Sequence, residues 1–454
     1  KPGSTPGRVT MKLLALETSC DETALAILEI KGSAKKPAFS VLSYTVASQV
    51  ALHAQYGGVF PAMAKREHAK NIVPLFKKTL SEANLLSPLS KKQHTDKLQF
   101  VSMLQSKKLE VLLEREKEMY AELVPLLSSI KKPKIDAIAV TTGPGLEPTL
   151  WVGINFARAL SYIWDIPLVP VNHMEGHVLS FLAQSKKKAS TKKQAPKNNV
   201  LEFGVCDLEF PAISLLVSGG HTEIVLVKDW GKYKVIGKTK DDAVGEAFDK
   251  VARMLDLPYP GGPQISRLAE EARKNAELTR NDTEKNSSVS TKDYRLATSN
   301  FLLPRPMLHS GDFDFSYSGL KTAVLYYIRD LTGGNKRPLT DVEKSSIALE
   351  FENAAIEVLV KKTIKAMKKY GASTLLVGGG VAANSHLRNE LARMCKVANT
   401  DTHTDTYTVL FPTRELSTDN AIMIGLAGAM TYLKNKKGVS YTSKKLTAHG
   451  NASL

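Results

Sequence analysis

Cysteine is scarce in this sequence, and the few cysteines form no pattern. Cys20, Cys206 and Cys395 are far apart, are odd in number and include no CxxC pair. A small scaffold held together by disulfides is therefore excluded. We expect a chain without structural disulfides that works in a reducing compartment.

Long apolar runs are also missing. The most uniformly apolar stretch, residues 421–433, is shorter than the roughly 18 to 20 residues needed to cross a bilayer, and it contains Gly425 and Gly428. We expect a buried helix there and no association with a membrane. No secretory or organellar targeting signal is recognisable, and we interpret residues 1–10 as a tag or processing remnant ahead of a start at Met11.

The phosphate-binding motif GxxxxGK[ST] is absent as well, which disfavours a P-loop ATPase. The chain has 454 residues, of which 43% are hydrophobic. This is enough for two or three compact units, and it excludes a disordered or collagen-like chain. The 62 Lys and Arg residues against 45 Asp and Glu give a net charge of +17. The excess suggests a polyanionic partner, although many proteins are basic only for solubility.

Two kinds of segment occur twice. Residues 12–29 and 212–228 each contain two apolar runs around a short polar turn, which is typical of a β-hairpin. A short strand leads into a glycine-rich turn and a helix at 135–164 and again at 374–394. This duplication predicts an α/β protein with two similar lobes that face each other across a central cleft. The glycine turns at the strand ends, such as Gly143 and Gly145, would line that cleft.

Three stretches of different composition interrupt these segments. Residues 87–134 contain a Lys- and Glu-rich amphipathic pattern that predicts a helix over 109–127. Residues 185–199 are rich in lysine and residues 275–297 are polar, so we interpret all three stretches as surface insertions. The expected domains are an N-terminal lobe, 11–170 completed by 412–440, and a C-terminal lobe, 171–411.

Two histidines stand four residues apart. His173 and His177 lie in the segment HMEGH, directly after a predicted strand at 166–171. On a helix this spacing places both imidazoles on one face, where they can bind the same metal ion. The segment is not the HExxH of zinc proteases, because its glutamate is the third residue. Asp419 is the candidate third ligand, and an ordinary helix N-cap is the alternative reading of this aspartate.

Glycine-rich turns follow two predicted strands. Ser218, Gly219 and Gly220 follow the first strand, and the triple glycine 378–380, with Asn384 close behind, follows the second. Glycine has no Cβ atom, so backbone N–H groups in such turns can approach an anion closely. We interpret the two turns together as a site for a phosphate and its nucleoside.

An acidic residue in the same half of the chain is a candidate for the sugar of that nucleoside. Asp249 lies in an amphipathic segment that is followed by a Gly-Gly turn containing Gly262. Its carboxylate could accept hydrogen bonds from ribose hydroxyls, with Gly262 allowing the sugar to approach the backbone. The alternative is an ordinary helix-surface pair with Arg253 at i+4.

Ten sequence blocks between Met11 and about residue 433 carry a resemblance to a known family. The blocks are LETSCDET (16–23), HAQYGGVFPAMAKREH (53–68), GPGL (143–146), HMEGH (173–177), LLVSGGHTE (215–223), DAVGEAFDK (242–250), YPGGP (259–263), FSYSGLKT (315–322), VGGGVAAN (377–384) and TDN (418–420). In this order they resemble the tRNA N6-adenosine threonylcarbamoyltransferases, bacterial TsaD and its mitochondrial and archaeal relatives. The form HMEGH, together with His221, is similar to the bacterial and mitochondrial branch.

The resemblance implies a duplicated actin-like, ribonuclease-H-like fold. It also implies transfer of a threonylcarbamoyl group from threonylcarbamoyl-adenylate to N6 of adenine 37 in tRNAs that read ANN codons. It further implies one divalent metal ion, iron or zinc, held by His173, His177 and Asp419. The implied contacts to the adenylate are Leu216, Val217, Ser218, Gly219, Gly220, Asp249, Gly262, Ser266 and Asn384.

Two parts of the expected site remain less defined. Ser266 stands where many members of the family carry a carboxylate near the ribose, so this chain departs from the pattern there. Asp21 and Glu22, in the first hairpin turn, are the candidate acid–base residues, and ordinary turn chemistry is their alternative reading.

The resemblance also implies partners and a compartment. The ligands would be tRNA and threonylcarbamoyl-adenylate. A bacterial protein would act in the cytoplasm with an inactive paralogue and a small ATPase, whereas a mitochondrial one would act as a homodimer in the matrix.

Three other functions compete with this interpretation. The paired histidines would also suit a metallopeptidase, and the expected fold would also suit a sugar- or acetate-kinase-like phosphotransferase. A scaffold paralogue is the non-enzymatic alternative. The retention of both His173 and His177 disfavours the scaffold, because a scaffold does not need a metal pair.

Overall fold

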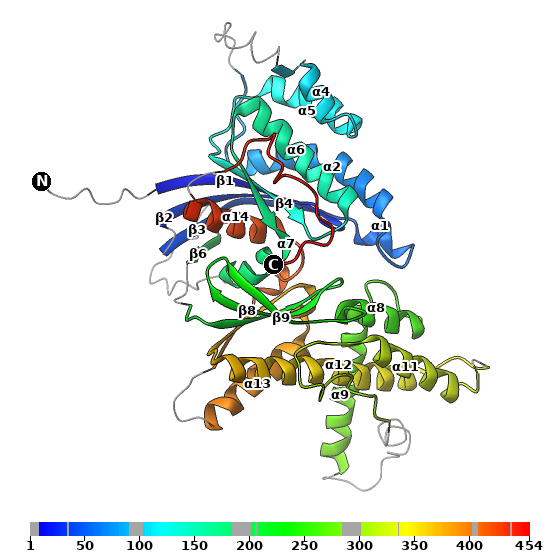
Figure 1. Cartoon of the computed structure of the whole chain (residues 1–454). Helices are drawn as coiled ribbons and strands as arrows, with labels where there is room; N and C mark the ends of the chain where they lie inside the picture. The colour runs from blue at the N-terminus through cyan, green and yellow to red at the C-terminus, as the bar shows by residue number, and fades with distance from the viewer. Residues whose placement is uncertain are drawn as a thin grey trace, which may run out of the picture. The chain divides into compact units, whose positions relative to one another are not determined.

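The structure is a computed structural model that describes residues 9–33, 36–89, 103–104, 106–183, 201–204, 208–283, 301–334, 336–401, 407–435 and 438–454. The chain forms two compact units (Figure 1). Unit 1 consists of Lys1–Leu208 and Pro412–Leu454, and unit 2 consists of Glu209–Phe411. None of the helices in the described ranges is long and apolar enough to span a membrane.

Unit 1 is built on a six-stranded mixed sheet. Its strands are β1 (Val9–Glu17), β2 (Glu22–Ser33), β3 (Lys36–Ser48), β4 (Ala137–Gly143), β5 (Leu168–Asn172) and β6 (Leu201–Gly204), in the order β5-β4-β1-β2-β3-β6. The first three strands form an antiparallel meander, whereas β4 and β5 run parallel to β1. The hairpin expected at residues 12–29 is therefore confirmed.

Unit 2 repeats this arrangement. Its strands are β7 (Ala212–Val217), β8 (Thr222–Asp229), β9 (Lys232–Lys238), β10 (Thr374–Gly378) and β11 (Thr408–Leu410), in the order β11-β10-β7-β8-β9. Again the first three strands are antiparallel and the last two run parallel to the first. Five strands in the same order and directions in both units confirm the predicted duplicated, actin-like α/β fold.

Helices cover both faces of the unit 1 sheet. The helices α2 (Pro61–Glu82) and α6 (Glu147–Trp164) pack on the face that carries Leu14 and Leu16, whereas α14 (Ala421–Asn435) packs on the other face. A Cβ atom added to Gly425 would lie 2.5 Å from a methyl of Leu28, and one added to Gly428 would lie 2.5 Å from Cβ of Ala139. The two glycines therefore let α14 approach the sheet closely, and the prediction of a buried helix at 421–433 is confirmed.

The expectation of a single helix over 109–127 is wrong. The segment forms two helices, α4 (Lys107–Leu112) and α5 (Lys117–Ser129). The break between them turns Leu113 and Glu116 inward, where they are 1% and 3% exposed. Lys65 of α2 lies 3.4 Å from the Glu116 carboxylate. Leu109, Leu123 and other side chains of the two helices belong to the core of unit 1, so this part is not a surface insertion.

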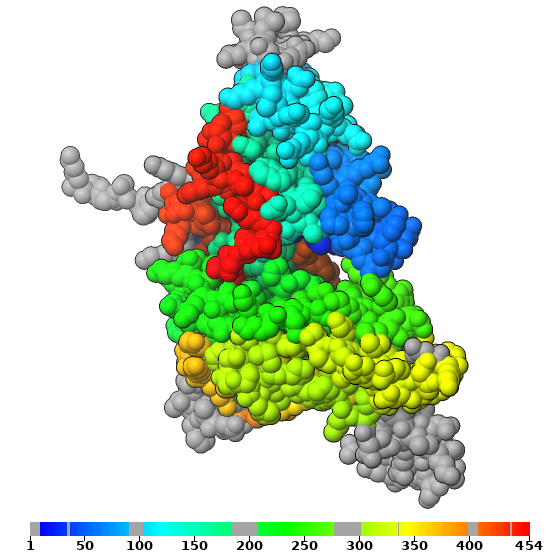
Figure 2. Space-filling model, turned by 45° about the vertical axis from the view of Figure 1, so that its right-hand side comes forward, coloured from blue at the N-terminus to red at the C-terminus, as the bar shows by residue number. Residues whose placement is uncertain are grey.

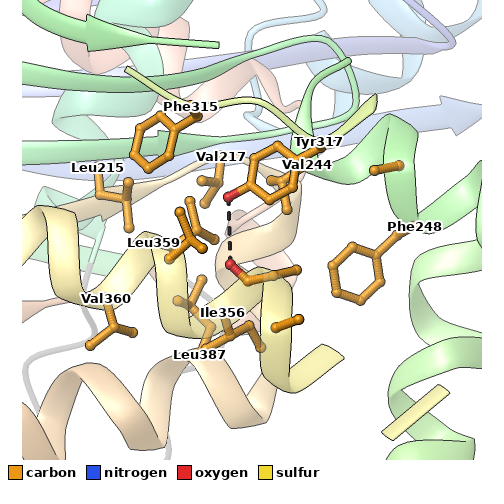
Figure 3. Close-up of a cluster of buried hydrophobic side chains, with 14 of the residues drawn as sticks. Leu215, Val217, Val244, Phe248, Phe315, Tyr317, Ile356, Leu359, Val360 and Leu387 are labelled. Atoms are coloured by element: carbon orange, nitrogen blue, oxygen red, sulfur yellow. Dashed lines mark hydrogen bonds between the residues drawn. The ribbon is translucent and has the colours of Figure 1, made fainter. Parts of the chain in front are cut away.

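Unit 2 has its core between its sheet and its helices. These are α8 (Val244–Met254), α9 (Gly261–Thr283), α11 (Ser318–Leu331) and α12 (Asp341–Tyr370), and α13 (Ser385–Asp401) packs on α12. Side chains of β7, α8, α12 and α13 meet in this core (Figure 3). The buried Tyr317 donates its hydroxyl hydrogen to the carbonyl of Ala355, 3.5 Å away, so its polar end is satisfied inside an apolar cluster.

The remaining short elements are α1 (Val50–Ala54), α7 (His173–Leu179), η1 (Ser180–Ala183), η2 (Gly380–Ala383) and η3 (Arg414–Leu416). The two units divide between Leu208 and Glu209, not at the expected residue 170. The reason is that β5 pairs with β4 and β6 pairs with β3, so both strands belong to the unit 1 sheet. The intervening α7 therefore also lies in unit 1. The helix α9 extends to Thr283, so the expected insertion at 275–297 begins as helix. The lysine-rich stretch 185–199 and most of residues 1–10 lie outside the described residues.

Candidate metal centre and nucleotide site

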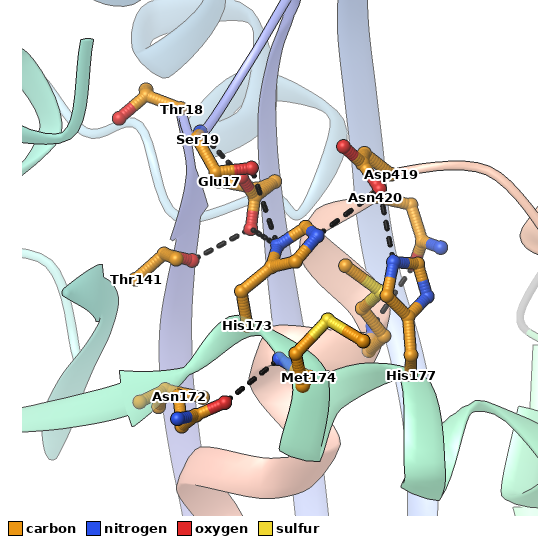
Figure 4. A network of polar contacts seen from close by, with 12 residues as sticks. Glu17, Thr18, Ser19, Thr141, Asn172, His173, Met174, His177, Asp419 and Asn420 are labelled. Atoms are coloured by element: carbon orange, nitrogen blue, oxygen red, sulfur yellow. Dashed lines mark hydrogen bonds and ion pairs between the residues drawn. The ribbon is translucent and has the colours of Figure 1, made fainter. Parts of the chain in front are cut away.

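The three predicted metal ligands lie together in unit 1 (Figure 4). Oδ1 of Asp419 is 3.3 Å from Nε2 of His173 and 3.1 Å from Nε2 of His177. The two imidazole rings stand nearly perpendicular, with their centroids 4.7 Å apart. Sequence spacing explains the histidine pair, and the fold brings Asp419 to it from a distant segment.

The helix α7 sets the direction of the two histidines. It begins directly at the end of β5, where the Asn172 side chain accepts hydrogen bonds from the N–H groups of Met174 and Glu175. This cap fixes the first turn, so that His173 and His177 follow on one face. A Cβ atom added to Gly176 would lie 3.1 Å from side-chain carbons of α14, so the glycine keeps α7 close to the helix that follows Asp419.

Asp419 is not the cap of α14. The side chain of Asn420 caps this helix, because its oxygen accepts from the N–H of Met423 at 2.9 Å. Its amide nitrogen donates to the carbonyls of Leu416 and Thr418. Asn420 therefore satisfies the helix end and leaves the neighbouring carboxylate free to face the histidines. The helix-cap alternative for Asp419 is wrong.

A buried carboxylate contacts the ring nitrogen of His173 that does not face Asp419. Oε2 of Glu17, at the end of β1, is 3.2 Å from Nδ1 of His173 and accepts a 2.6 Å hydrogen bond from the Thr141 hydroxyl. The other oxygen of Glu17 accepts from the N–H of Ser19 at 2.6 Å. Glu17 is fully buried. Such a carboxylate, placed on the second ring nitrogen, orients a metal-binding imidazole and raises its basicity.

The charges around His173 act in opposite directions. Burial disfavours the charged imidazole, but the carboxylates of Asp419 and Glu17 outweigh it, so the pKa of His173 is raised well above its ordinary value. Burial would raise the pKa of Asp419, yet the two histidines hold it far below its usual range. The surroundings of Asp419 therefore strongly favour the negatively charged form of its carboxyl group, with a positive charge opposite it.

These residues fit a divalent metal ion. Atoms bound at about 2.1 Å to one ion lie about 3.0 to 3.4 Å from each other in octahedral or tetrahedral geometry, and the Asp419 oxygen has this separation from both Nε2 atoms. Two imidazoles and one carboxylate suit zinc and iron better than calcium or magnesium. Within the described residues, His173, His177 and Asp419 form the group of His, Cys, Asp or Glu side chains that lie close enough together to hold one metal ion.

The first hairpin turn lies beside the same group. The hydroxyl of Ser19 is 3.2 Å from Nδ1 of His173. Asp21 is 8% exposed. Burial, followed by the charges of Asp21 and Asp419, raises the pKa of Glu22 to about 10. The candidate acid–base pair is thus within electrostatic reach of the candidate metal ligands.

In unit 2, the two glycine turns meet at the carboxyl edge of the sheet. The strands β7 and β10 are adjacent and parallel, with Leu216 opposite Gly378. Gly379 has φ +91°, and a Cβ atom added to it would lie 2.3 Å from the carbonyl oxygen of Val217. The second turn can therefore lie against the first only because position 379 is glycine.

The first turn presents open backbone. Its N–H at Ser218 donates to the carbonyl of His221, and the Ser218 hydroxyl accepts from the His221 N–H at 3.1 Å, which closes the turn. A Cβ atom added to Gly219 or Gly220 would meet nothing within 4 Å. Within the described residues, no hydrogen bond uses the N–H of either glycine. These two N–H groups are available to an anion.

Asp249 holds the start of α9. Its Oδ1 accepts a 2.7 Å hydrogen bond from the N–H of Gly261. Burial raises the pKa of Asp249, against the opposing hydrogen bonds from the N–H groups of Gly261 and Gly262. A Cβ atom added to Gly261 would lie 2.8 Å from Cα of Asp249, whereas one added to Gly262 would meet nothing within 4 Å. Gly262 is thus the open glycine of this turn.

Asn384 and Ser266 touch each other, and sequence reasoning missed their third partner. The amide nitrogen of Asn384 donates to the Ser266 hydroxyl at 2.8 Å and to Oε1 of Glu352 at 2.7 Å. Glu352 lies in the middle of α12 and is 1% exposed. A glutamate beside the core residue Phe351 was the available signal in the sequence. Glu17, an acidic residue ending an apolar strand, was a similar signal in unit 1.

The glycine turn of unit 1 does not present an open surface. The C-terminal segment of the chain lies on it, where the N–H of Gly145 donates to the carbonyl of Gly450 and the N–H of His449 donates to the carbonyl of Thr142. A Cβ atom added to Gly143 would lie 2.0 Å from the His449 carbonyl oxygen. The red C-terminal segment covers this side of unit 1 in Figure 2. The expectation that Gly143 and Gly145 line a ligand site is therefore wrong, because the chain's own tail fills the turn.

Residues 40–88, 122–196 and 197–426 match the sequence model of the family described as tRNA N6-adenosine threonylcarbamoyltransferase. A protein of this name from Nitrosospira multiformis is 36% identical over 420 residues, which cover 92% of this chain and 91% of the relative. One from Staphylococcus aureus is 36% identical over 442 residues, which cover 97% and 96%. Among solved structures, component A of (R)-2-hydroxyglutaryl-CoA dehydratase from Acidaminococcus fermentans has a TM-score of 0.41 and 10% identity, over 94% of this chain and 98% of that one.

Proposed function

Because the chain belongs to the tRNA N6-adenosine threonylcarbamoyltransferase family and is therefore a transferase, we propose its reaction in detail. It transfers the threonylcarbamoyl group from threonylcarbamoyl-adenylate to N6 of adenine 37 in tRNAs that read ANN codons. The observation that carries this proposal is the convergence of His173, His177 and Asp419 inside the region that matches the family.

We assign binding of the adenylate to unit 2. In the reaction, N6 of the adenine attacks the carbamoyl carbon, the bond from that carbon to the phosphate oxygen breaks, and AMP leaves with the electron pair. The phosphate carries negative charge throughout, and the free N–H groups of Gly219 and Gly220 can donate to it. The open face at Gly262, next to Asp249, gives the ribose room to approach the backbone.

We assign the metal to His173, His177 and Asp419, with zinc or iron as the ion. The chemistry that a divalent ion supplies at such a ligand set is Lewis-acid stabilisation of a negatively charged oxygen. Glu17 holds His173 in position through Nδ1, so that Nε2 faces Asp419. The hydrogen bonds of Glu17, Ser19 and Thr141 hold His173 in place in advance, so this ligand does not have to reorganise during each reaction cycle.

The attacking N6 must also lose a proton. Asp21 and Glu22, in the turn after β1, are acidic residues that we assign neither as ligands nor as support for His173, and we propose them as the acid–base pair. The raised pKa of Glu22 keeps this group protonated at neutral pH, while its neighbour is the acceptor. If the protein is bacterial, an inactive paralogue and a small ATPase complete the reaction, and if it is mitochondrial, a homodimer does.

The test is a reconstitution of tRNA modification. Purified protein is given threonylcarbamoyl-adenylate and an unmodified tRNA that reads ANN codons, with the family partners present, and the tRNA nucleosides are analysed by mass spectrometry. We expect modified adenosine with the wild-type protein and its loss, by at least about a hundredfold, with His177→Ala. The control is His309→Ala, since His309 is an exposed histidine of unit 2.

Two outcomes would contradict the proposal. One is unmodified tRNA with all partners present and the protein folded. The other is normal activity of His177→Ala. A phosphotransferase would instead move the phosphate of ATP to an acceptor, and a metallopeptidase would cleave peptides in a manner that depends on His177, so the same variant separates these alternatives.

A further inference from the structure

The amide of Asn384 has a single possible orientation. Its oxygen accepts a hydrogen bond from the N–H of Leu387 at 2.8 Å, which caps the start of α13. Its nitrogen donates both hydrogens, one to Ser266 and one to Glu352. A flipped amide would point its oxygen at the Glu352 carboxylate and its nitrogen at a backbone N–H, and both contacts would repel. Asn384 therefore has no amide hydrogen left for a ligand.

Glu352 imposes this orientation together with the N–H of Leu387. It is 1% exposed, and its second oxygen accepts a 2.7 Å hydrogen bond from a guanidinium nitrogen of Arg273. The same nitrogen lies 2.9 Å from the side-chain oxygen of Asn353. A carboxylate buried this deeply is tolerated only with a charged partner and satisfied lone pairs. Both oxygens of Glu352 are thus engaged, one in holding the ion pair and the other in holding Asn384.

The fixed orientation of the Asn384 amide determines which hydrogen-bonding role is left to Ser266, on the second turn of α9. The hydroxyl oxygen of Ser266 accepts the hydrogen from Asn384. Within the described part of the chain, the hydroxyl hydrogen of Ser266 has no acceptor. The half-buried side chain lies four residues after the open Gly262. A donor is therefore presented beside the turn that we assign to the ribose.

We propose that Glu352 is a positioning residue of the nucleotide site, which fixes the Asn384 amide so that Ser266 donates its hydroxyl hydrogen to an oxygen of the bound nucleotide. This inference rests on the proposed function, because it uses the adenylate site assigned to unit 2. Asn384 acts through Ser266 and through the start of α13. Ser266, as a donor, takes a role that a carboxylate at this position cannot fill without a proton.

The first experiment measures AMP binding by isothermal titration calorimetry. Glu352→Gln keeps the size of the side chain but has one acceptor oxygen, so it cannot serve both Arg273 and Asn384. We expect the dissociation constant for AMP to rise about five- to tenfold, the usual effect of losing one well-placed hydrogen bond. In the modification assay, KM for the adenylate should rise while kcat changes little, because the contact is made equally in the ground state and the transition state.

The matched control is Glu350→Gln on the same helix. Glu350 also accepts from a guanidinium, that of Arg305 at 2.5 Å, and from the N–H of Leu303 at 2.9 Å. A loss of thermal stability like that of Glu352→Gln is expected, with no change in AMP affinity. If the two variants lower Tm alike and neither changes AMP binding, Glu352 is only structural and the inference is wrong.

A double-mutant cycle then tests the route through Ser266. Ser266→Ala removes the donor, so adding Glu352→Gln to it should weaken AMP binding by less than twofold further. Full additivity of the two losses would show that Glu352 does not act through Ser266. An AMP dissociation constant unchanged in Glu352→Gln would overturn this inference alone. Failure of the wild-type protein to bind AMP would overturn the assigned nucleotide site and the inference with it.

Discussion

Nδ1 of His173 lies 3.2 Å from Oε2 of Glu17, although 156 positions separate the two residues in the chain. The contact joins the end of β1 to the start of α7. It gives the candidate metal ligand a buried anionic partner, and the Thr141 hydroxyl and the Ser19 N–H hold this partner in turn.

Glu17→Gln should therefore weaken metal binding without removing a ligand. We expect the metal dissociation constant to rise about ten- to a hundredfold, because the imidazole loses its orienting carboxylate. The measurement is a competition titration of zinc against a chromophoric chelator. Glu29→Gln, on the partner strand and partly exposed beside Lys31, is the control and should bind zinc like the wild type. Equal affinities of Glu17→Gln and Glu29→Gln would refute the role of Glu17.

Gly379→Ala should destabilise unit 2. Position 379 has φ +91°, and the added methyl would lie 2.3 Å from the Val217 carbonyl oxygen, so the backbone must move. We expect a loss of about 2 to 3 kcal/mol in the free energy of unfolding, measured by urea denaturation. The control is the adjacent Gly380→Ala, whose methyl meets nothing within 4 Å and should change stability by less than about 0.5 kcal/mol. Similar losses in both variants would contradict the steric argument.

Glu343 should contribute stability that depends on pH. The Arg337 guanidinium, together with the capping contacts to Thr340, lowers the pKa of Glu343 from 4.5 to about 2. Because the folded-state pKa is depressed, the contribution is complete above pH 4.5 and is lost as the pH falls through about 2. Glu343→Gln should cost about 1 kcal/mol at pH 7, a value reduced by the partial exposure of the pair.

The measurement for Glu343 is chemical denaturation of both proteins at pH 7, 5 and about 3.5. The difference between wild type and Glu343→Gln should be constant from pH 7 to 5 and smaller at the lowest pH. The exposed Glu122→Gln serves as the control, with a difference near zero at every pH. A Glu343→Gln difference that grows on acidification would mean that the sign of the shift is wrong.

Lys362 should matter far more than its neighbour Lys361. The side chain of Lys362 is 2% exposed, and its ammonium donates to the Ser310 hydroxyl and the Asp314 carbonyl. Burial lowers the pKa of Lys362. Lys362→Met leaves those two acceptors without a donor and should cost about 1 to 3 kcal/mol. Lys361→Met removes only an exposed i,i+4 pair with Glu357 and should cost about 0.5 kcal/mol or less, so equal melting temperatures would contradict this assignment.

Local patterns in the sequence predicted the repeated elements well. Hairpins, strand–glycine–helix segments and the buried helix at 421–433 follow from periodicity and turn residues, which act over a few positions. The helix over 109–127 was predicted as one piece because its periodicity continues. Only the tertiary structure reveals that Leu113 and Glu116 both turn inward, Glu116 beside Lys65 of α2, and that the helix breaks between them.

The candidate site divides in the same way. His173 and His177 could be paired from their spacing, because one turn of helix brings i and i+4 together. Asp419 could be named from the sequence as a candidate third ligand, with a helix cap as the alternative. The contact of Glu17 with His173 needed the fold, because no local rule relates residues 156 positions apart. Glu352 was missed for the same reason, since its contacts to Asn384 and Arg273 cross from α12 to two other helices.

By itself, the sequence determined the family, the duplicated α/β fold and the residue types of the two sites, because these depend on local periodicity and on motifs in a fixed order. The tertiary structure decided the division at Leu208, the capping role of Asn420 that frees Asp419, and the burial of Gly143 under the C-terminal segment. The division and the burial of Gly143 depend on which distant segments exclude water from one another, and side-chain packing fixes that choice only in the folded chain. The cap by Asn420 is local, but only the fold brings the neighbouring Asp419 to the histidines.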